Sequence, residues 1–203
     1  MKSFLLLILL LISQQSFAVE SNWKELVASD LVSPVTTPAR YILIGGSIAS
    51  AVAFFNQSRN PYKKRESFKD AQPIGNFGFL GEYLGYGPLN LGYIAWASWY
   101  GHHYQSETML KNAEIMARAS LYSSSLTLAL KSTISERRPG YPDDNHSFPS
   151  GHSSASFSFA SVIAARHGWY YGSAAYALAG FIAVSRVNDD FHYLHEHIFK
   201  KIE

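Results

Sequence analysis

The sequence predicts an all-α protein folded as a helical bundle. No stretch shows the alternation of apolar and polar residues that is typical of strands. Long apolar segments are instead separated by clusters of glycine, proline and polar residues, which end helices. No internal repeat or low-complexity tract interrupts this pattern. We therefore predict one helical-bundle domain over residues 41–203.

Residues 1–18 are interpreted as a Sec signal peptide. A basic start is followed by the uncharged apolar run Phe4 to Ile12. Small residues at Ser16 and Ala18 fit cleavage before Val19. The apolar core is too short for a typical membrane span. We expect export to the periplasm or to the periplasmic face of the inner membrane. The chain has no cysteine, so packing alone must stabilise an exported fold.

Residues 19–40 are expected to form a leader in front of the domain. A short helix is predicted around Trp23 to Leu31. Pro34 and Pro38 then favour an extended segment, because proline cannot donate a backbone hydrogen bond.

The first part of the domain begins with an uncharged helix over Tyr41 to Phe55, whose many small residues favour close packing. The basic segment Gln57 to Asp70 follows. It is interpreted as a solvated loop, with contact to anionic lipid as the alternative. Ile74 to Tyr100 is rich in glycine and aromatic residues, with Glu82 as its only charge. Gly85 to Pro88 is expected to break this stretch into two helices.

The second part contains three further predicted helices and a short last one. Ser106 to Lys131 is amphipathic, and Ser153 to Arg166 and Gly172 to Arg186 are apolar. The link between the last two is placed at His167 to Tyr171. A short final helix is expected to start near His192.

A turn-forming sequence, Ser147 to His152, runs directly into one of these apolar helices. Backbone N–H groups at a helix start, together with the positive end of the helix dipole, attract anions. Gly151 lets an anion approach the backbone closely, and Ser150 adds a hydroxyl donor. His152 would then stand beside the bound anion. An ordinary turn is the alternative interpretation.

Cations lie at two other helix ends. Lys131 closes one helix, and Arg138 follows shortly before Pro139. Arg186 closes another helix, with His192 a few residues later. If these groups converge on the turn at Ser150, they form a site for a tetrahedral oxyanion.

These motifs resemble those of the type-2 phosphatidic acid phosphatase superfamily, which also includes bacterial non-specific acid phosphatases and vanadium haloperoxidases. The resemblance covers Lys131 to Glu196, in the family's order and spacing. It implies a helical bundle of the acid phosphatase and haloperoxidase type. The matching residues are Lys131 with Arg138-Pro139, Pro149-Ser150-Gly151-His152, and Ser185-Arg186 with His192.

The resemblance implies hydrolysis of phosphate monoesters, or of lipid phosphates and pyrophosphates, without metal or other cofactor. His192 would be the nucleophile that forms a phospho-histidine, and His152 the acid that protonates the leaving oxygen. Glu196 would orient His192, at a position where the family normally has aspartate. The phosphoryl oxygens would be bound by Lys131, Arg138, Ser150, Gly151 and Arg186.

The residue types fit this chemistry on their own. A neutral imidazole can attack phosphorus, and a second imidazole can donate a proton. Fixed cations stabilise the charge on the phosphoryl oxygens. The alternatives are a phosphate-binding pseudoenzyme, a vanadate-dependent haloperoxidase with the same ligands, and a purely structural envelope protein.

Other polar residues have simpler interpretations. A metal site at His192, His195, Glu196 and His197 is disfavoured, because the spacing matches no known ligand pattern. Surface or interfacial positions are expected for His102, His103 and His146. Capping or pairing with the basic groups is expected for Asp143, Asp144, Asp189 and Asp190.

Composition limits the partners. A net charge of only +2 gives no basic field for nucleic acid. The 13 Tyr, 13 Phe and 4 Trp suit either a dense core or the lipid interface, so we expect membrane contact and a substrate that is small or lipid-linked. Multi-pass insertion is the alternative, because Tyr41 to Phe55 and Gly168 to Ser185 could nearly span a bilayer. No feature predicts an oligomeric state.

Overall fold

The computed structural model describes residues 23–36, 74–134, 143–146 and 149–188, and all the elements in these ranges are helical. The predicted all-α class is therefore confirmed for them. The elements are α2 (Trp23–Thr36), a 3₁₀ turn η1 (Gly75–Phe77), α5 (Gly78–Gly85), α6 (Pro88–His103), α7 (Glu107–Ile134), α8 (Gly151–His167) and α9 (Trp169–Asn188).

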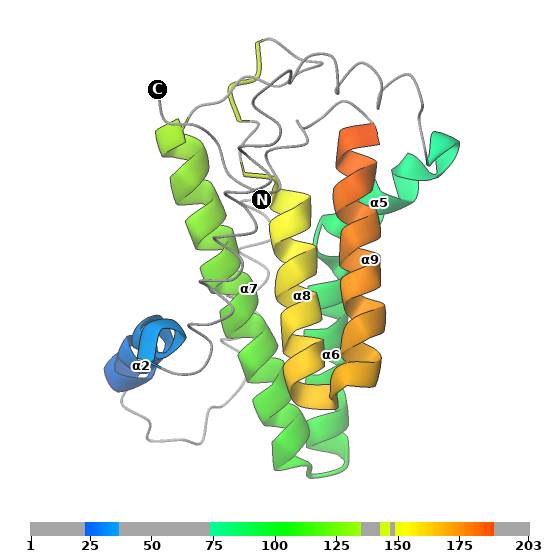
Figure 1. Cartoon of the computed structure of the whole chain (residues 1–203). Coiled ribbons are helices and arrows are strands. Elements are labelled where there is room, and N and C mark those ends of the chain that lie inside the picture. The colour runs from blue at the N-terminus through cyan, green and yellow to red at the C-terminus, as the bar shows by residue number, and fades with distance from the viewer. Residues whose placement is uncertain (1–22, 37–73, 135–142, 147–148, 189–203) are drawn as a thin grey trace.

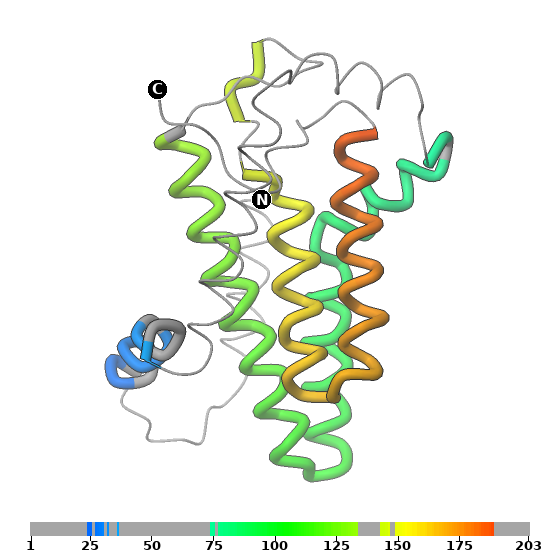
Figure 2. Tube along the Cα trace, in the orientation of Figure 1, coloured from blue at the N-terminus to red at the C-terminus, as the bar shows by residue number. Residues whose placement is uncertain are grey.

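Helices α6 to α9 run alternately up and down and form the body of the molecule (Figure 1). Each packs against the next in sequence, and α6 also contacts α8. The short helix α5 lies across α9 and α8 (Figure 2). This order brings the end of α7, the start of α8 and the end of α9 to the same end of the bundle.

The core is made largely of small aliphatic side chains, which allow the helices to approach closely. At the α8–α9 contact, a Cβ added to Gly172 would lie only 2.5 Å from the Cβ of Ala164. The buried cluster comprises Ile94, Met116, Ala117, Ala160, Val162, Ile163, Ala175 and Ala179.

A buried asparagine joins three of the helices. The side-chain amide of Asn90 in α6 donates to Ser120 Oγ of α7 at 2.9 Å and to the carbonyl of Ala155 in α8 at 3.3 Å. A buried amide is costly unless it is hydrogen-bonded, so this network favours one packing arrangement over others. It fixes the first turns of α8 relative to α6 and α7.

The predicted break between the two helices of the Gly-rich stretch is confirmed. Gly87 adopts a left-handed conformation with φ of 99°, which residues other than glycine rarely adopt. Pro88 then occupies the first turn of α6, where its missing N–H costs nothing. The chain therefore turns sharply from α5 into α6.

Two predicted boundaries are corrected. The link expected at His167 to Tyr171 is reduced to Gly168, whose φ of 86° allows α9 to begin at once. The helix expected over Trp23 to Leu31 continues through Pro34 to Thr36. Its extension is accompanied by a hydrogen bond from the Thr36 hydroxyl to the carbonyl of Val32, at 3.1 Å.

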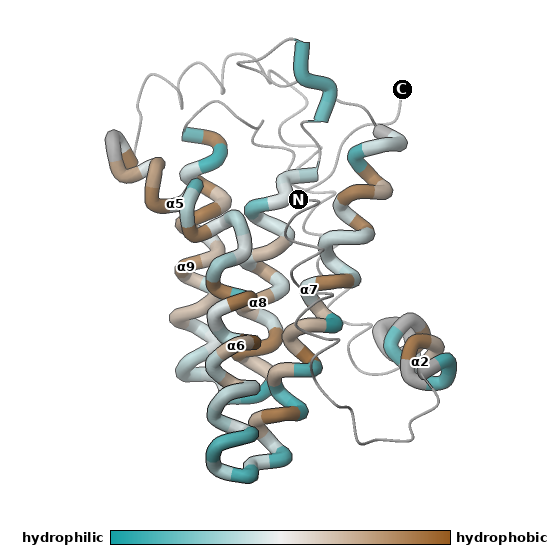
Figure 3. The backbone as a smooth tube through the Cα atoms, turned by 180° about the vertical axis from the view of Figure 1, so that it is seen from behind, coloured by the Kyte–Doolittle hydropathy of each residue, from teal (hydrophilic) through white to brown (hydrophobic). Residues whose placement is uncertain are grey.

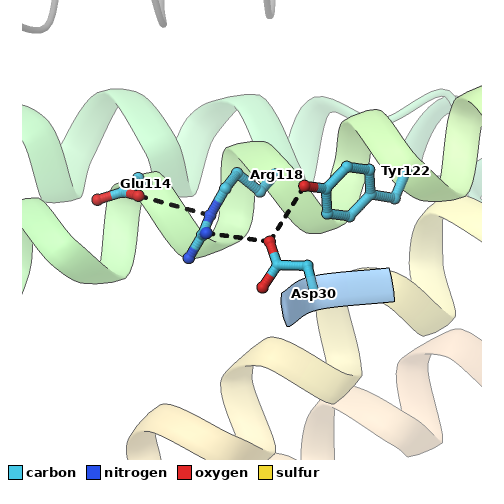
Figure 4. Close-up of polar contacts among 4 residues, drawn as sticks. All are labelled: Asp30, Glu114, Arg118 and Tyr122. Carbon is cyan, nitrogen blue, oxygen red and sulfur yellow. Dashed lines mark hydrogen bonds and ion pairs between the residues drawn. The ribbon is translucent and has the colours of Figure 1, made fainter. Parts of the chain in front are cut away.

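Helix α2 is attached to α7 by one carboxylate (Figure 4). Asp30 Oδ2 accepts hydrogen bonds from Arg118 Nη1 at 3.0 Å and from the Tyr122 hydroxyl at 3.1 Å. Arg118 also pairs with Glu114 on its own helix, at 3.5 Å. The leader segment thus contacts the bundle through a small polar network.

Hydrophobic residues are unevenly distributed along the chain: they are frequent in α5, whereas the turn from α6 to α7 is hydrophilic (Figure 3). Among the described residues, no helix is both long enough and apolar enough to cross a membrane. The predicted signal peptide, the helix at Tyr41 to Phe55, the basic segment Gln57 to Asp70 and the helix near His192 lie outside the described residues.

Candidate active site

Among the residues predicted to bind phosphate, those that the structure describes come from three helix ends at one end of the bundle (Figure 1). Lys131 lies in the last turn of α7, and Arg186 in the last turn of α9. Ser150, Gly151 and His152 form the start of α8. Helices that are consecutive in sequence and antiparallel in space therefore bring two of the three predicted cations to the same end of the bundle as the predicted anion turn.

The start of α8 has the geometry of a capped helix. Ser150 is 2 % exposed and forms the N-cap, and its Oγ accepts a hydrogen bond from the Ser153 N–H at 3.4 Å. A hydroxyl that accepts one hydrogen bond still has its own proton to donate. The N–H of Gly151, the first residue of α8, has no intrahelical acceptor because of its position. Both groups can thus donate to an anion at the positive end of the helix dipole.

Lys131 is linked to the segment that leads into this turn. Its ammonium donates to the backbone carbonyl of His146, and the side chain is only 8 % exposed. His146 is itself held by Asp144, whose carboxylate accepts from the His146 N–H at 2.9 Å. One turn after the cap, the carbonyl of Ser154 accepts from the Ser123 hydroxyl of α7, at 3.2 Å. These contacts fix the end of α7 against the start of α8.

Arg186 is a buried cation with a carboxylate nearby. Its side chain is 2 % exposed, and Nη1 lies 4.0 Å from Glu82 Oε2 of α5. Burial removes water from the guanidinium, so an anion that reaches it interacts more strongly than at the surface. Glu82 itself is partly exposed.

Helix α5 packs closely against the start of α8 and the end of α9 through two glycines, Gly81 and Gly85, which are four residues apart. A Cβ at Gly81 would lie 1.8 Å from Ser185 Oγ, and a Cβ at Gly85 would lie 2.7 Å from both Cβ and Cδ2 of His152. Residues four apart share a helix face, so both contacts lie on one side of α5. This face contacts the second and third predicted motifs together.

The N-terminal side of α5 is tied to the end of α9. The Asn188 side chain accepts from the Ile74 N–H and donates to the carbonyl of Gly75, both at 3.3 Å. Asn188 follows Arg186 by two residues. The position of α5 is therefore coupled to the same helix end that carries the predicted phosphate ligand.

Three of the predicted site residues, Arg138, His192 and Glu196, lie outside the described residues. The assembled part of the candidate site thus comprises Lys131, Ser150, Gly151, His152 and Arg186. Within the described ranges, no group of three or more His, Asp or Glu side chains is placed to hold a metal ion.

Sequence reasoning did not assign Glu82 to the site. The signal was present, because Glu82 is the only charge between Ile74 and Tyr100 and stands next to a pair of glycines four residues apart. A single charge in an apolar helix with a small-residue face indicates a helix packed closely against a polar centre. The interpretation of His102, His103 and His146 as surface residues is confirmed, since all three are exposed.

Comparison of the chain with models of known families, with curated proteins and with solved structures found no match.

Proposed function

We propose that the protein is a metal-independent phosphatase that hydrolyses phosphate monoesters, or lipid phosphates and pyrophosphates, through a phospho-histidine intermediate. The observation that carries the proposal is the location of two buried cations, Lys131 and Arg186, at the same end of the bundle as the capped start of α8. A phosphoryl group offers three oxygens to such a set of donors.

In the proposed first step, the His192 imidazole attacks phosphorus while the bond from phosphorus to the ester oxygen breaks. His152 gives its ring proton to that oxygen, so the leaving group departs as a neutral alcohol. Lys131, Arg138 and Arg186, together with the donors of Ser150 and Gly151, stabilise the charge on the other phosphoryl oxygens. These roles follow the family resemblance, and the positions of the five described residues support them.

In the second step, neutral His152 takes a proton from water as the water oxygen bonds to phosphorus. The bond between phosphorus and His192 breaks, and inorganic phosphate leaves. The Glu196 carboxylate accepts a hydrogen bond from the other ring N–H of His192. The attacking nitrogen of His192 is thereby kept unprotonated. The cycle returns every group to its starting state, so no metal or redox partner is needed.

We further propose that the protein is exported and touches the membrane from the periplasmic side. Exposed aromatic side chains support this, because tyrosine and tryptophan favour the boundary between lipid and water. They occur at the start of α9, and in α5 and just before it. More than half of the residue is exposed in each of Phe77, Phe79, Tyr83, Trp169, Tyr170 and Tyr171. A carbonate wash of the membrane fraction should release the protein. A protease added from the periplasmic side should cleave within Gln57 to Asp70. Retention together with a protected segment would contradict peripheral contact.

The function is tested by turnover of a chromogenic phosphate ester in the presence of a metal chelator. We expect hydrolysis, and near-complete loss in His192→Ala, because the covalent route disappears. Vanadate at about millimolar concentration, in the range of enzyme substrate levels, should inhibit by occupying the pocket of Lys131, Arg138 and Arg186. Phosphate binding without turnover would indicate a pseudoenzyme, and peroxide-dependent halide oxidation with bound vanadate would indicate a haloperoxidase.

A further inference from the structure

The ring of Tyr86 contacts the ring of His152 at the edge of the candidate site. The two ring centroids are 4.4 Å apart, and the ring planes meet at 61°. Edge-on arrangements of this kind are preferred for aromatic pairs, and they add to the free energy of the contact beyond the area buried. Tyr86 is the C-cap residue directly after α5, and it comes directly before the left-handed Gly87.

The backbone that carries Tyr86 is held on both sides. Before it, Gly85 packs against His152 and Ile182 with no room for a Cβ atom. After it, Gly87 and Pro88 fix the turn into α6. The imidazole of His152 is therefore confined between the backbone of Gly85 and the ring of Tyr86. Neither neighbour belongs to the motifs that carry the family resemblance.

Tyr86 is nevertheless 60 % exposed, so one part of its ring packs on His152 while the rest is open. A side chain that served only to fill the core would be buried. An exposed ring with one fixed contact suits a group that restricts the orientation of its neighbour and leaves space for a ligand beside it.

We propose that Tyr86 is a positioning residue for His152, and that it holds the imidazole in the orientation that protonates the leaving oxygen. The proposal rests on the proposed function, in which His152 is the general acid. A displaced proton donor slows the reaction by orders of magnitude even when it is still present. The ring is required in this role, and the phenol hydroxyl is not.

The leaving group provides a readout that loss of structure alone would not give. An alkyl alcohol leaves poorly unless its oxygen is protonated, whereas p-nitrophenolate leaves readily as an anion. Tyr86→Leu should lower kcat/KM for an alkyl phosphate by roughly 10- to 100-fold; this parameter reports the first step and leaves out the later hydrolysis of the intermediate, which is the same for both esters. For p-nitrophenyl phosphate the decrease should stay below about threefold, because protonation contributes little to that reaction. Tyr86→Phe keeps the ring and should restore both rates.

The matched control is Tyr83→Leu, the same change on the same helix at a residue that is 71 % exposed and packs against Phe79 instead. It should leave both rates unchanged with water-soluble esters. Tyr86→Met is a second ring-free variant, which keeps the test open if Tyr86→Leu folds poorly. Equal losses on the two esters in a folded ring-free variant, or failure of Tyr86→Phe to restore the alkyl rate, would overturn the proposal.

The ring resonances of His152, followed by NMR, separate this proposal from the proposed function. Tyr86→Leu should shift them, because the aromatic neighbour is lost, and Tyr83→Leu should not. A wild-type protein that hydrolyses neither ester overturns the phosphatase function, and the role of His152 as an acid with it. Unshifted His152 resonances in an active enzyme overturn only the assignment of Tyr86.

Discussion

Gly85 lies so close to His152 that a single added methyl group would collide with the imidazole. A Cβ built at Gly85 comes within 2.7 Å of His152 Cδ2 and 2.9 Å of a methyl carbon of Ile182. Real Cβ atoms do not approach other atoms this closely, so the helix or the ring would have to move. The predicted proton donor is thus held by backbone packing from a helix that the phosphatase motifs do not include.

Gly85→Ala should therefore destabilise the protein and lower its rate of turnover. Overpacking of this kind costs about 1–3 kcal/mol, and the same displacement of His152 should lower turnover. Gly92→Ala is the matched control, because the helical Gly92 of α6 has nothing within 4 Å of an added Cβ. That variant should gain about 0.5–1 kcal/mol from alanine's higher helix propensity. Equal free energies of unfolding for the two variants, measured in urea, would contradict the close packing of Gly85 against His152.

Removal of the charge on Glu82 should tighten phosphate binding. Its carboxylate lies 4.0 Å from the buried guanidinium of Arg186 and repels an anion bound there. Because Glu82 is partly exposed, we expect an effect of about 1 kcal/mol, or roughly fivefold in Kd. Titration calorimetry of Glu82→Gln with inorganic phosphate measures it. Glu114→Gln, which breaks a pair with Arg118 on α7, is the control and should leave the affinity unchanged.

Weaker phosphate binding in Glu82→Gln would mean that Glu82 orients Arg186 for the ligand and does not oppose binding. An unchanged affinity would indicate that phosphate binds away from Arg186.

The stabilisation that the contact between α2 and α7 provides should decrease at alkaline pH. Burial, together with the hydrogen bond to Asp30 and its charge, raises the pKa of Tyr122 above its usual value of 10.0, although Arg118 opposes the shift. A raised pKa in the folded state means that the stabilisation is complete below about pH 10 and is lost as Tyr122 ionises above it.

Tyr122→Phe should accordingly cost about 0.5–1.5 kcal/mol near neutral pH, where its hydrogen bond is lost. Above about pH 10 the difference from wild type should shrink. Urea unfolding across this range measures both quantities, and the other tyrosines affect both proteins alike. If the difference in the free energy of unfolding between wild type and Tyr122→Phe stays constant with pH, ionisation of Tyr122 does not weaken its contact with Asp30.

The sequence was sufficient to predict the elements with strong local signals. Gly87 and Pro88 mark their own break, and the Pro-Ser-Gly turn before α8 marks the helix start with its cap. Lys131 and Arg186 were correctly placed at helix ends. The link at Gly168 was predicted too long, because the aromatic run after it gives no sign that it already belongs to α9.

The contacts made by α5 could not be predicted in the same way. They join residues about seventy to one hundred positions apart in sequence, as in Gly85 with His152 and Glu82 with Arg186. Local propensity does not encode such pairs; they follow from the way the helices pack. The same holds for Asp30 of α2, whose partners Arg118 and Tyr122 in α7 lie about ninety positions further along the chain.

The most direct test of the central claim is detection of the covalent intermediate. The protein is mixed with a phosphate ester, quenched within one turnover under alkaline conditions that preserve phospho-histidine, and mapped by peptide mass spectrometry. The account predicts a phosphoryl group on His192, its absence in His192→Ala, and its accumulation in variants whose second step is slowed. Steady hydrolysis with no phosphoryl group on His192, or with the group on another residue, would contradict it.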